Sequence, residues 1–130
     1  MEISSLRFAD AVVVSVVGKI DFASSPRLDE ALAPLLKPSA DGPGAIVVDF
    51  AGVHFISSPG LRLLMIAAKT MHARQAAFAV ASLDPFVDEV VRVTGFNELF
   101  CVFPSVRDAL RSLSGPALAA YERATDPPLA

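Results

Sequence analysis

Serine, histidine and aspartate, the residue types of a hydrolytic triad, occur together around the middle of the chain. The candidates are Ser57 or Ser58 as nucleophile, His54 or His72 as base, and Asp21 or Asp49 as orienting acid. A nucleophile elbow has the pattern G-x-S-x-G, whereas the run Ile56-Ser57-Ser58-Pro59-Gly60 lacks the leading glycine. The spacing does not favour a nucleophile-base pair, and we expect no enzymatic activity.

Metal and cofactor sites are also weakly indicated. The two histidines and the single Cys101 are dispersed, and no glycine-rich phosphate-binding pattern occurs. Cys101 lies in an apolar run from 99 to 103 that indicates a buried strand, where a free thiol behaves as a small hydrophobe. The sequence therefore predicts no metal, no cofactor and no reactive thiol.

Ser58 precedes Pro59, a residue typical of the first helical turn. This order predicts Ser58 as the N-cap of a helix, where a side-chain oxygen accepts from unpaired backbone N–H groups. A phosphate at this position would be favoured by the positive helix end and would add about -1.5 to -2 charges to an apolar surface. Two interpretations stay open here, an ordinary cap and a modification site.

Segments with the hydrophobic pattern of strands alternate along the chain with segments that have the pattern of helices. These elements must position the residues named above. Strands are expected at 3–8, 11–18, 45–48, 76–82 and 99–103, and helices at 24–36, 59–74, 86–93 and after Ser105. The segment 49–61, between the strand at 45–48 and the long helix, is expected to be a loop. Strands alternating with helices after a hairpin predict an α/β fold: a mixed, largely parallel sheet of four or five strands flanked by about four helices, in the order ββαβαβαβα. The expected core comprises Val12, Val14, Val16, Ile46, Val48, Leu61, Leu64, Met65 and Val80.

Length and charge limit the function classes. With 130 residues we expect one domain over 1–114, followed by a tail over 115–130 that could add one short helix and is otherwise disordered. A net charge of -3 argues against nucleic-acid binding. The longest stretch without Asp, Glu, Lys or Arg, 50–61, contains His54 and is too short to span a membrane, and Met1-Glu2 does not begin a signal peptide. We expect a cytoplasmic protein without a membrane partner.

Several short motifs in order resemble the STAS-domain anti-sigma factor antagonist family. The segment 47–62, VVDFAGVHFISSPGLR, resembles its signature. Gly18-Lys19-Ile20-Asp21 is similar to the family's turn after the second strand, and 87–100 and 105–110 are similar to its third helix, the following strand and its final helix. The resemblance covers about 3–113 and implies a STAS-like fold.

The resemblance also implies a switch. Ser58 matches the serine that, in the family, is phosphorylated by a partner that is both kinase and anti-sigma factor; the neighbouring Ser57 is the less favoured acceptor. Pro59 replaces a small residue, and Asp21 matches the turn acid near the phosphorylation site. The partner-binding residues implied are Asp21, Ser57, Ser58, Pro59, Gly60, Arg62 and Lys69.

In the implied mechanism, the unphosphorylated protein binds a GHKL-type anti-sigma factor/serine kinase and releases its captive regulator. Phosphorylation at Ser58 ends the complex, and a PP2C-type phosphatase restores it. We expect a monomer, with a dimer as the alternative. The rival interpretations are a STAS subunit of a lipid-transport or transporter assembly, a scaffold in a stress-sensing complex, and a small hydrolase using Ser58.

Overall fold

The computed structural model describes residues 1–125, which form a five-stranded sheet and five α-helices. The strands are β1 (Glu2–Phe8), β2 (Ala11–Ile20), β3 (Ala45–Ile56), β4 (Ala77–Ala81) and β5 (Cys101–Phe103). The helices are α1 (Ser25–Leu36), α2 (Ser58–Ala73), α3 (Pro85–Val93), α4 (Val106–Leu113) and α5 (Gly115–Thr125), with a short 3-10 helix at Phe96–Glu98. The sheet order is β1-β2-β3-β4-β5, with β1 antiparallel to β2 and all other pairs parallel. This arrangement confirms the predicted α/β fold.

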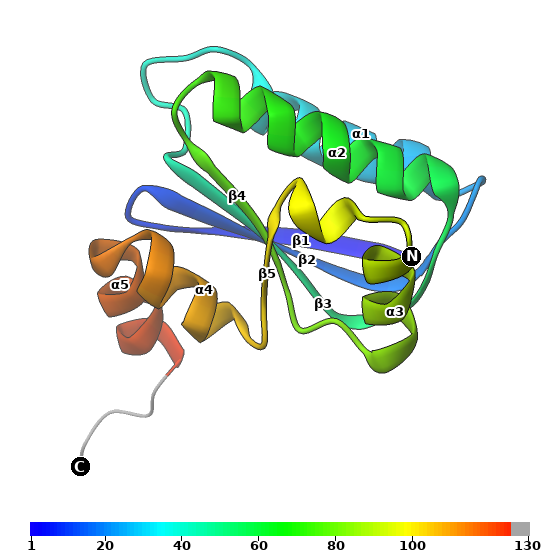
Figure 1. The fold of residues 1–130 in the computed structure, drawn as a ribbon. Helices are drawn as coiled ribbons and strands as arrows, with labels where there is room; N and C mark the ends of the chain where they lie inside the picture. The colour runs from blue at the N-terminus through cyan, green and yellow to red at the C-terminus, as the bar shows by residue number, and fades with distance from the viewer. Residues whose placement is uncertain (126–130) are drawn as a thin grey trace.

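Helices cover both faces of the sheet (Figure 1). Helices α1 and α2 lie on one face, α4 and α5 on the other, and α3 lies at the end where the parallel strands finish. Alternate residues of β2 and β3 therefore enter two different cores. Val14 and Val48 join the α1–α2 side, whereas Val13 and Val47 join the α4–α5 side. Burial on both faces explains why these strands are almost continuously apolar.

The predicted core is confirmed except at Met65, which is only half-buried. The buried positions of α2 are 60, 61, 64, 67, 68 and 71, which form one stripe at helical spacing. Met65 lies at the margin of that stripe.

The predicted loop at 49–61 is wrong, because β3 continues to Ile56 and α2 begins at Ser58. Strand β2 continues to Ile20 rather than ending at Gly18, and the two strands pair in parallel as far as Ile20 and Ile56. The pairing shifts register at two places, one of them at Gly18, whose φ of +118° is a conformation that suits glycine. The sequence motif thus lies on a strand end and not in a loop.

The segment after residue 114 forms a full helix on the second core. Ala117 is buried, and the Phe8 and Tyr121 rings pack edge to face at 5.4 Å between centroids. The Ser114 hydroxyl donates to Asp10 at 2.5 Å and accepts from the Ala117 N–H. Helix α5 thereby completes the cover of the sheet. The disorder expected further along the tail concerns residues outside the described range.

Cys101 is exposed, contrary to the prediction of a buried thiol. The last strand is shorter than expected, because Gly95, with a φ of +78°, leads into the 3-10 helix and delays the strand to residue 101. Strand β5 pairs only with β4 and forms an edge of the sheet. One side of this short strand is consequently open.

Candidate functional site

The residues that the sequence singled out meet where β2 and β3 end. A cavity of about 590 Å³ lies there between the turn after β2 and the start of α2. Its lining residues are Asp21, Phe22, Ala23, Phe55, Ile56, Ser57 and Ser58. Asp21 is far from the two serines in the sequence, yet all three share one cavity.

The two neighbouring serines have different environments. Ser57, rather than Ser58, is the N-cap of α2: its hydroxyl accepts from the Gly60 N–H at 3.3 Å, and its own N–H donates to Ile20 at 2.7 Å. Ser57 is half-buried, whereas Ser58 is exposed as the first helical residue. Within residues 1–125, the Ser58 hydroxyl has no hydrogen-bond partner. The cap lies one residue earlier than predicted because β3 runs directly up to the helix.

Asp21 is fixed by reciprocal hydrogen bonds with Ser24. The Asp21 N–H donates to the Ser24 hydroxyl, and the Ser24 N–H donates to the Asp21 carboxylate, both at 2.9 Å. The Ser24 hydroxyl also donates to the Lys19 carbonyl at 2.7 Å. The Ser24 backbone N–H, followed by its hydroxyl, lowers the pKa of Asp21 below its ordinary value. The cavity therefore has an ionised carboxylate held in place at its rim.

The other predicted partner-binding residues are not all at this cavity. Gly60 is buried, and an added Cβ would lie 2.6 Å from Ile20 Cγ2, so the glycine allows α2 to approach the strands closely. Pro59 and Arg62 line a neighbouring cavity of about 270 Å³ with residues of α1. Lys69 lies eleven residues beyond Ser58, about 16 Å along the helix axis.

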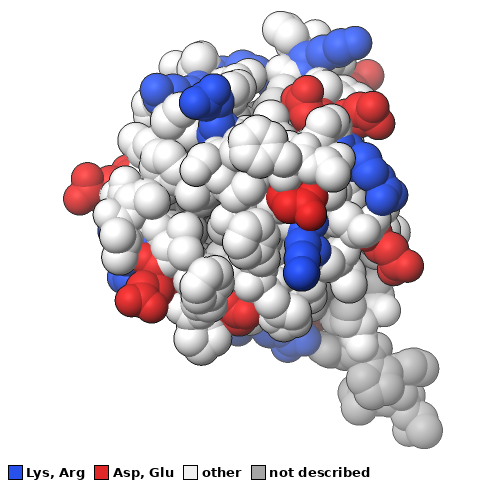
Figure 2. Space-filling view, turned by 90° about the vertical axis from the view of Figure 1, so that its right-hand side faces the viewer, with Lys and Arg blue, Asp and Glu red and all other residues white. Residues whose placement is uncertain are grey.

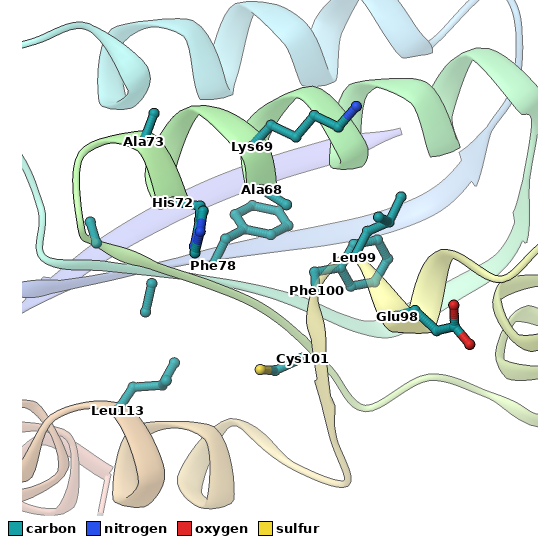
Figure 3. Close-up of a pocket in the computed structure, with 12 residues that line it drawn as sticks. Ala68, Lys69, His72, Ala73, Phe78, Glu98, Leu99, Phe100, Cys101 and Leu113 are labelled. Carbon is teal, nitrogen blue, oxygen red and sulfur yellow. The ribbon is translucent and has the colours of Figure 1, made fainter.

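Lys69 instead borders a separate cavity of about 490 Å³ between α2, β4, the chain before β5 and α4 (Figure 3). His72, Phe100 and Cys101 also line it. Helix α2 thus connects two different surface regions, and one of the predicted contact residues belongs to the region away from Ser58.

No serine-histidine-aspartate chain assembles among the described residues. His54 Nδ1 lies 2.9 Å from Asp84 Oδ2, and His72 is at the cavity of Figure 3. Asp49 accepts from the Ala51 N–H. Asp84 is also the N-cap of α3, where the Val87 N–H and then His54 lower the pKa of its carboxyl. The His54 imidazole therefore links β3 to the start of α3, and it forms no hydrogen bond with a serine among the described residues.

Neither a metal-binding cluster nor a membrane-spanning helix occurs in the described part of the chain. Residues 1–125 contain no group of three or more metal-ligating side chains. None of their helices is long and apolar enough to cross a membrane.

Sequence reasoning missed Phe22 and Phe55 as cavity residues, and it missed the contact of His54 with Asp84. An aromatic residue directly after the turn acid was the available signal for Phe22. The other two depend on β3 reaching Ile56, which brings residues 54 and 55 to the end of the sheet.

Similarity to known proteins identifies the family of the chain. The STAS domain family profile matches residues 3–109. Anti-sigma-F factor antagonist RsfB of Mycobacterium tuberculosis is 28% identical over 103 residues, which cover 79% of this chain and 81% of RsfB.

Solved structures of anti-sigma factor antagonists have the same fold. One from Mycobacterium paratuberculosis has a TM-score of 0.78 and 28% identity, over 86% of this chain and 92% of its own. SpoIIAA in its unphosphorylated form has a TM-score of 0.70 over 85% of this chain and 96% of its own; at 14% identity this likeness concerns the fold alone. The chain therefore belongs to the STAS domain family, and these three relatives are anti-sigma factor antagonists.

Proposed function

We propose that the protein is an anti-sigma factor antagonist that works by partner switching, with Ser58 as its phosphorylation site. In its unphosphorylated form it binds an anti-sigma factor that is also a serine kinase of the GHKL type, and it thereby releases the regulator held by that factor. Phosphorylation of Ser58 ends the complex, and a PP2C-type phosphatase restores the binding form. These reactions take place in the cytoplasm.

The contrast between the two serines carries this proposal. A kinase needs a hydroxyl that can enter its active site, and Ser58 is exposed without an internal hydrogen-bond partner among residues 1–125. The Ser57 hydroxyl is half-buried and occupied by the Gly60 N–H. Phosphorylation of Ser57 would remove the cap of α2, whereas phosphorylation of Ser58 leaves it in place.

The start of α2 offers few donors that could draw a Ser58 phosphate inward. Pro59 has no N–H, and the Gly60 N–H already donates to Ser57. The phosphate therefore stays at the surface, where it adds about -1.5 to -2 charges beside Phe22 and Phe55. A partner that covers this surface would have to desolvate that charge, which explains why phosphorylation ends binding.

Asp21 and Arg62 supply charges on the two sides of Ser58. Asp21 is fixed in the cavity that Ser58 also lines. Arg62 follows Ser58 by four residues on α2, so Ser58 and Arg62 lie on one face of that helix. We assign Asp21 to recognition of a cationic group on the kinase, and Arg62 to contact with the phosphate or with an acidic group of the partner.

The test uses purified wild-type protein and the variants S58A, S58E and S57A with each anti-sigma factor kinase of the source organism, expressed separately. With ATP, phosphopeptide mapping should locate phosphate on Ser58 in the wild type and in S57A, and none in S58A. S58A should bind the kinase as tightly as the unphosphorylated wild type, and S58E more weakly. Phosphate on Ser57 alone, or full affinity of S58E, would contradict the assignment.

A further inference from the structure

The cavity of Figure 3 exists because β5 begins late. Cys101, the first residue of β5, pairs with Ala79, so no strand of the described chain pairs with Ala77 and Phe78 on that side of β4. Helix α2 on one face of the sheet and Leu113 of α4 on the other face both reach this gap. The result is a cavity of about 490 Å³, which lies within the range of small-molecule sites, roughly 300–1,000 Å³.

Most of the cavity wall is apolar. Phe78 and Phe100 are buried, and their rings pack edge to face at 6.1 Å between centroids. The other apolar lining residues have short or aliphatic side chains: Ala68, Ala73, Ala76, Ala77, Leu99 and Leu113. A wall that contains two rings held against each other suits the hydrocarbon part of a ligand, whose surface is removed from water on binding.

Two basic side chains lie on the α2 side of the cavity. Lys69 and His72 are three residues apart on the helix, so they are neighbours on its surface and can contact one small group together. Within residues 1–125, neither side chain has a hydrogen bond or an ion pair. The backbone carbonyls of Met71 and His72, at the end of α2, already accept from N–H groups of the following turn. Lys69 and His72 are therefore available to donate to an anionic group.

The other polar side chains of the cavity are Glu98 and Cys101. Glu98 is the one acidic residue among the described residues of the wall, and Figure 3 shows its carboxylate directed away from His72. The sulfur of Cys101 is directed toward Leu113. A ligand that lies beside Leu113 would cover this thiol, so Cys101 can report whether the cavity is occupied.

Two other hollows of the surface lack this combination of groups. The hollow on α3, of about 370 Å³, contains Phe86, and the one charged residue among its described lining residues is Glu89. Helix α3 lies on the side of the molecule shown in Figure 2, where uncharged side chains cover much of the surface. The cavity at Ser58 likewise has an acidic residue, Asp21, and no basic one among its described lining residues. An apolar wall with two basic groups is therefore a property of the cavity of Figure 3 and not of these two.

We propose that the cavity of Figure 3 binds a small amphipathic carboxylate. Its hydrocarbon part, an alkyl chain or an aromatic ring, lies against Phe78 and Phe100, and its carboxylate accepts hydrogen bonds from Lys69 and His72. Burial of the hydrocarbon part favours binding, and the two basic groups select a carboxylate over a neutral head group. The site lies away from Ser58, and its existence does not depend on the proposed function.

The test titrates the purified protein with octanoate and with naphthoate and follows the backbone amide signals by NMR. Saturable shifts should occur at the cavity residues with at least one of the two probes, and the tighter probe identifies the hydrocarbon class. K69Q and H72Q should each weaken binding about fivefold or more. K37Q is the matched control, because Lys37 is an exposed lysine just after α1 and does not line the cavity. Circular dichroism should show all three variants folded.

Cys101 gives a second, independent measurement. At a probe concentration ten times its Kd, about one-tenth of the protein is unoccupied, so the reaction of the native thiol with an aromatic disulfide reagent should slow about tenfold. Acetate at the same concentration should not slow the reaction, because it carries the charge without the hydrocarbon part. Octanol, which has the alkyl chain without the charge, should bind more weakly than octanoate.

The assignment fails if neither probe binds saturably, or if the shifts lie outside the cavity. It is also overturned if octanol binds as tightly as octanoate, or if K69Q and H72Q bind like K37Q, because the basic groups then do not select the carboxylate. An unchanged rate of reaction at Cys101 with bound probe would place the ligand elsewhere and likewise contradict it. None of these measurements involves the kinase or phosphorylation of Ser58, so a failure here leaves the proposed function unaffected.

Discussion

Nδ1 of His54 lies 2.9 Å from Oδ2 of Asp84, although the two residues are thirty positions apart in the chain. The same carboxylate accepts from the Val87 N–H at 2.8 Å through its other oxygen. One side chain therefore caps α3 and ties it to β3. The position of α3 against β3 depends on both contacts.

This double role predicts a pH effect. The pKa of Asp84 is lowered in the folded protein, so folding favours its ionised form. The stability that Asp84 supplies is present above the ordinary pKa of 3.8 and is lost as the pH falls through the lowered value. Asn at this position can still cap the helix but cannot titrate. The difference in unfolding free energy between the wild type and D84N should therefore shrink in urea titrations below about pH 4; a difference that is constant with pH would contradict this account.

Ser57 and Ser58 should differ in their effect on stability. S57A removes the side-chain acceptor of the Gly60 N–H and should lower the free energy of unfolding by about 0.5 to 2 kcal/mol. S58A removes an exposed hydroxyl and should change stability by less than about 0.5 kcal/mol. Urea unfolding of both variants checks this. Greater destabilisation by S58A than by S57A would assign the cap to Ser58 after all.

Gly60 should not tolerate a side chain. An alanine Cβ would lie 2.6 Å from Ile20 Cγ2 and 3.0 Å from Ile56 Cγ1, so the strands and α2 would have to move apart. We expect G60A to lose about 1 to 3 kcal/mol of stability. G115A is the comparison variant, because a Cβ on Gly115 meets no atom within 4 Å. Thermal unfolding should show a lower midpoint for G60A than for G115A.

Cys101 should react with a thiol reagent in the native state. Its exposure on the open side of β5 leaves access to the sulfur without unfolding. When the native protein is treated with an aromatic disulfide reagent, one equivalent of the reagent's thiolate should be released per chain, in agreement with the single cysteine of the sequence. Reaction only after addition of denaturant would show that the thiol is covered.

Arg62 should influence binding without influencing the fold. It is exposed, and removal of an exposed charge usually changes stability little. R62E should weaken binding to the kinase or slow phosphorylation at Ser58, most strongly at low ionic strength, because salt screens such contacts. K69E is the control, since Lys69 borders the cavity of Figure 3 rather than the Ser58 cavity.

Helices and strands with a regular pattern of hydrophobic residues could be predicted from the sequence. The residues at which they end were harder to predict. The apolar run from Val12 to Val16 and the apolar stripe of α2 are enough to identify a strand covered on both faces and a long helix. The second half of β3 cannot be identified as a strand from its sequence, because it contains Asp49, Gly52 and His54, which are polar or glycine residues more typical of loops. They belong to the strand only because β2 is long enough to pair with it.

The candidate site could be predicted only in part, because its details depend on where the strands end. The family resemblance identified the region of Ser58 and Asp21, and the structure brings both to one cavity. The identity of the cap depended on the last residue of β3, so the sequence placed it one position too far along. The exposure of Cys101 depended on where β5 begins, which the apolar run from 99 to 103 could not indicate.

The backbone hydrogen bond from Ser57 to Ile20 also has a kinetic consequence. It joins Ser57, the residue before Ser58, to the end of β2, an interior strand of the sheet, with a distance of 2.7 Å between nitrogen and oxygen. A serine on such a support needs no slow rearrangement before a partner can engage it. We expect the encounter with the kinase to follow a single bimolecular phase in stopped-flow experiments, and the lifetime of the complex to be set by dissociation alone.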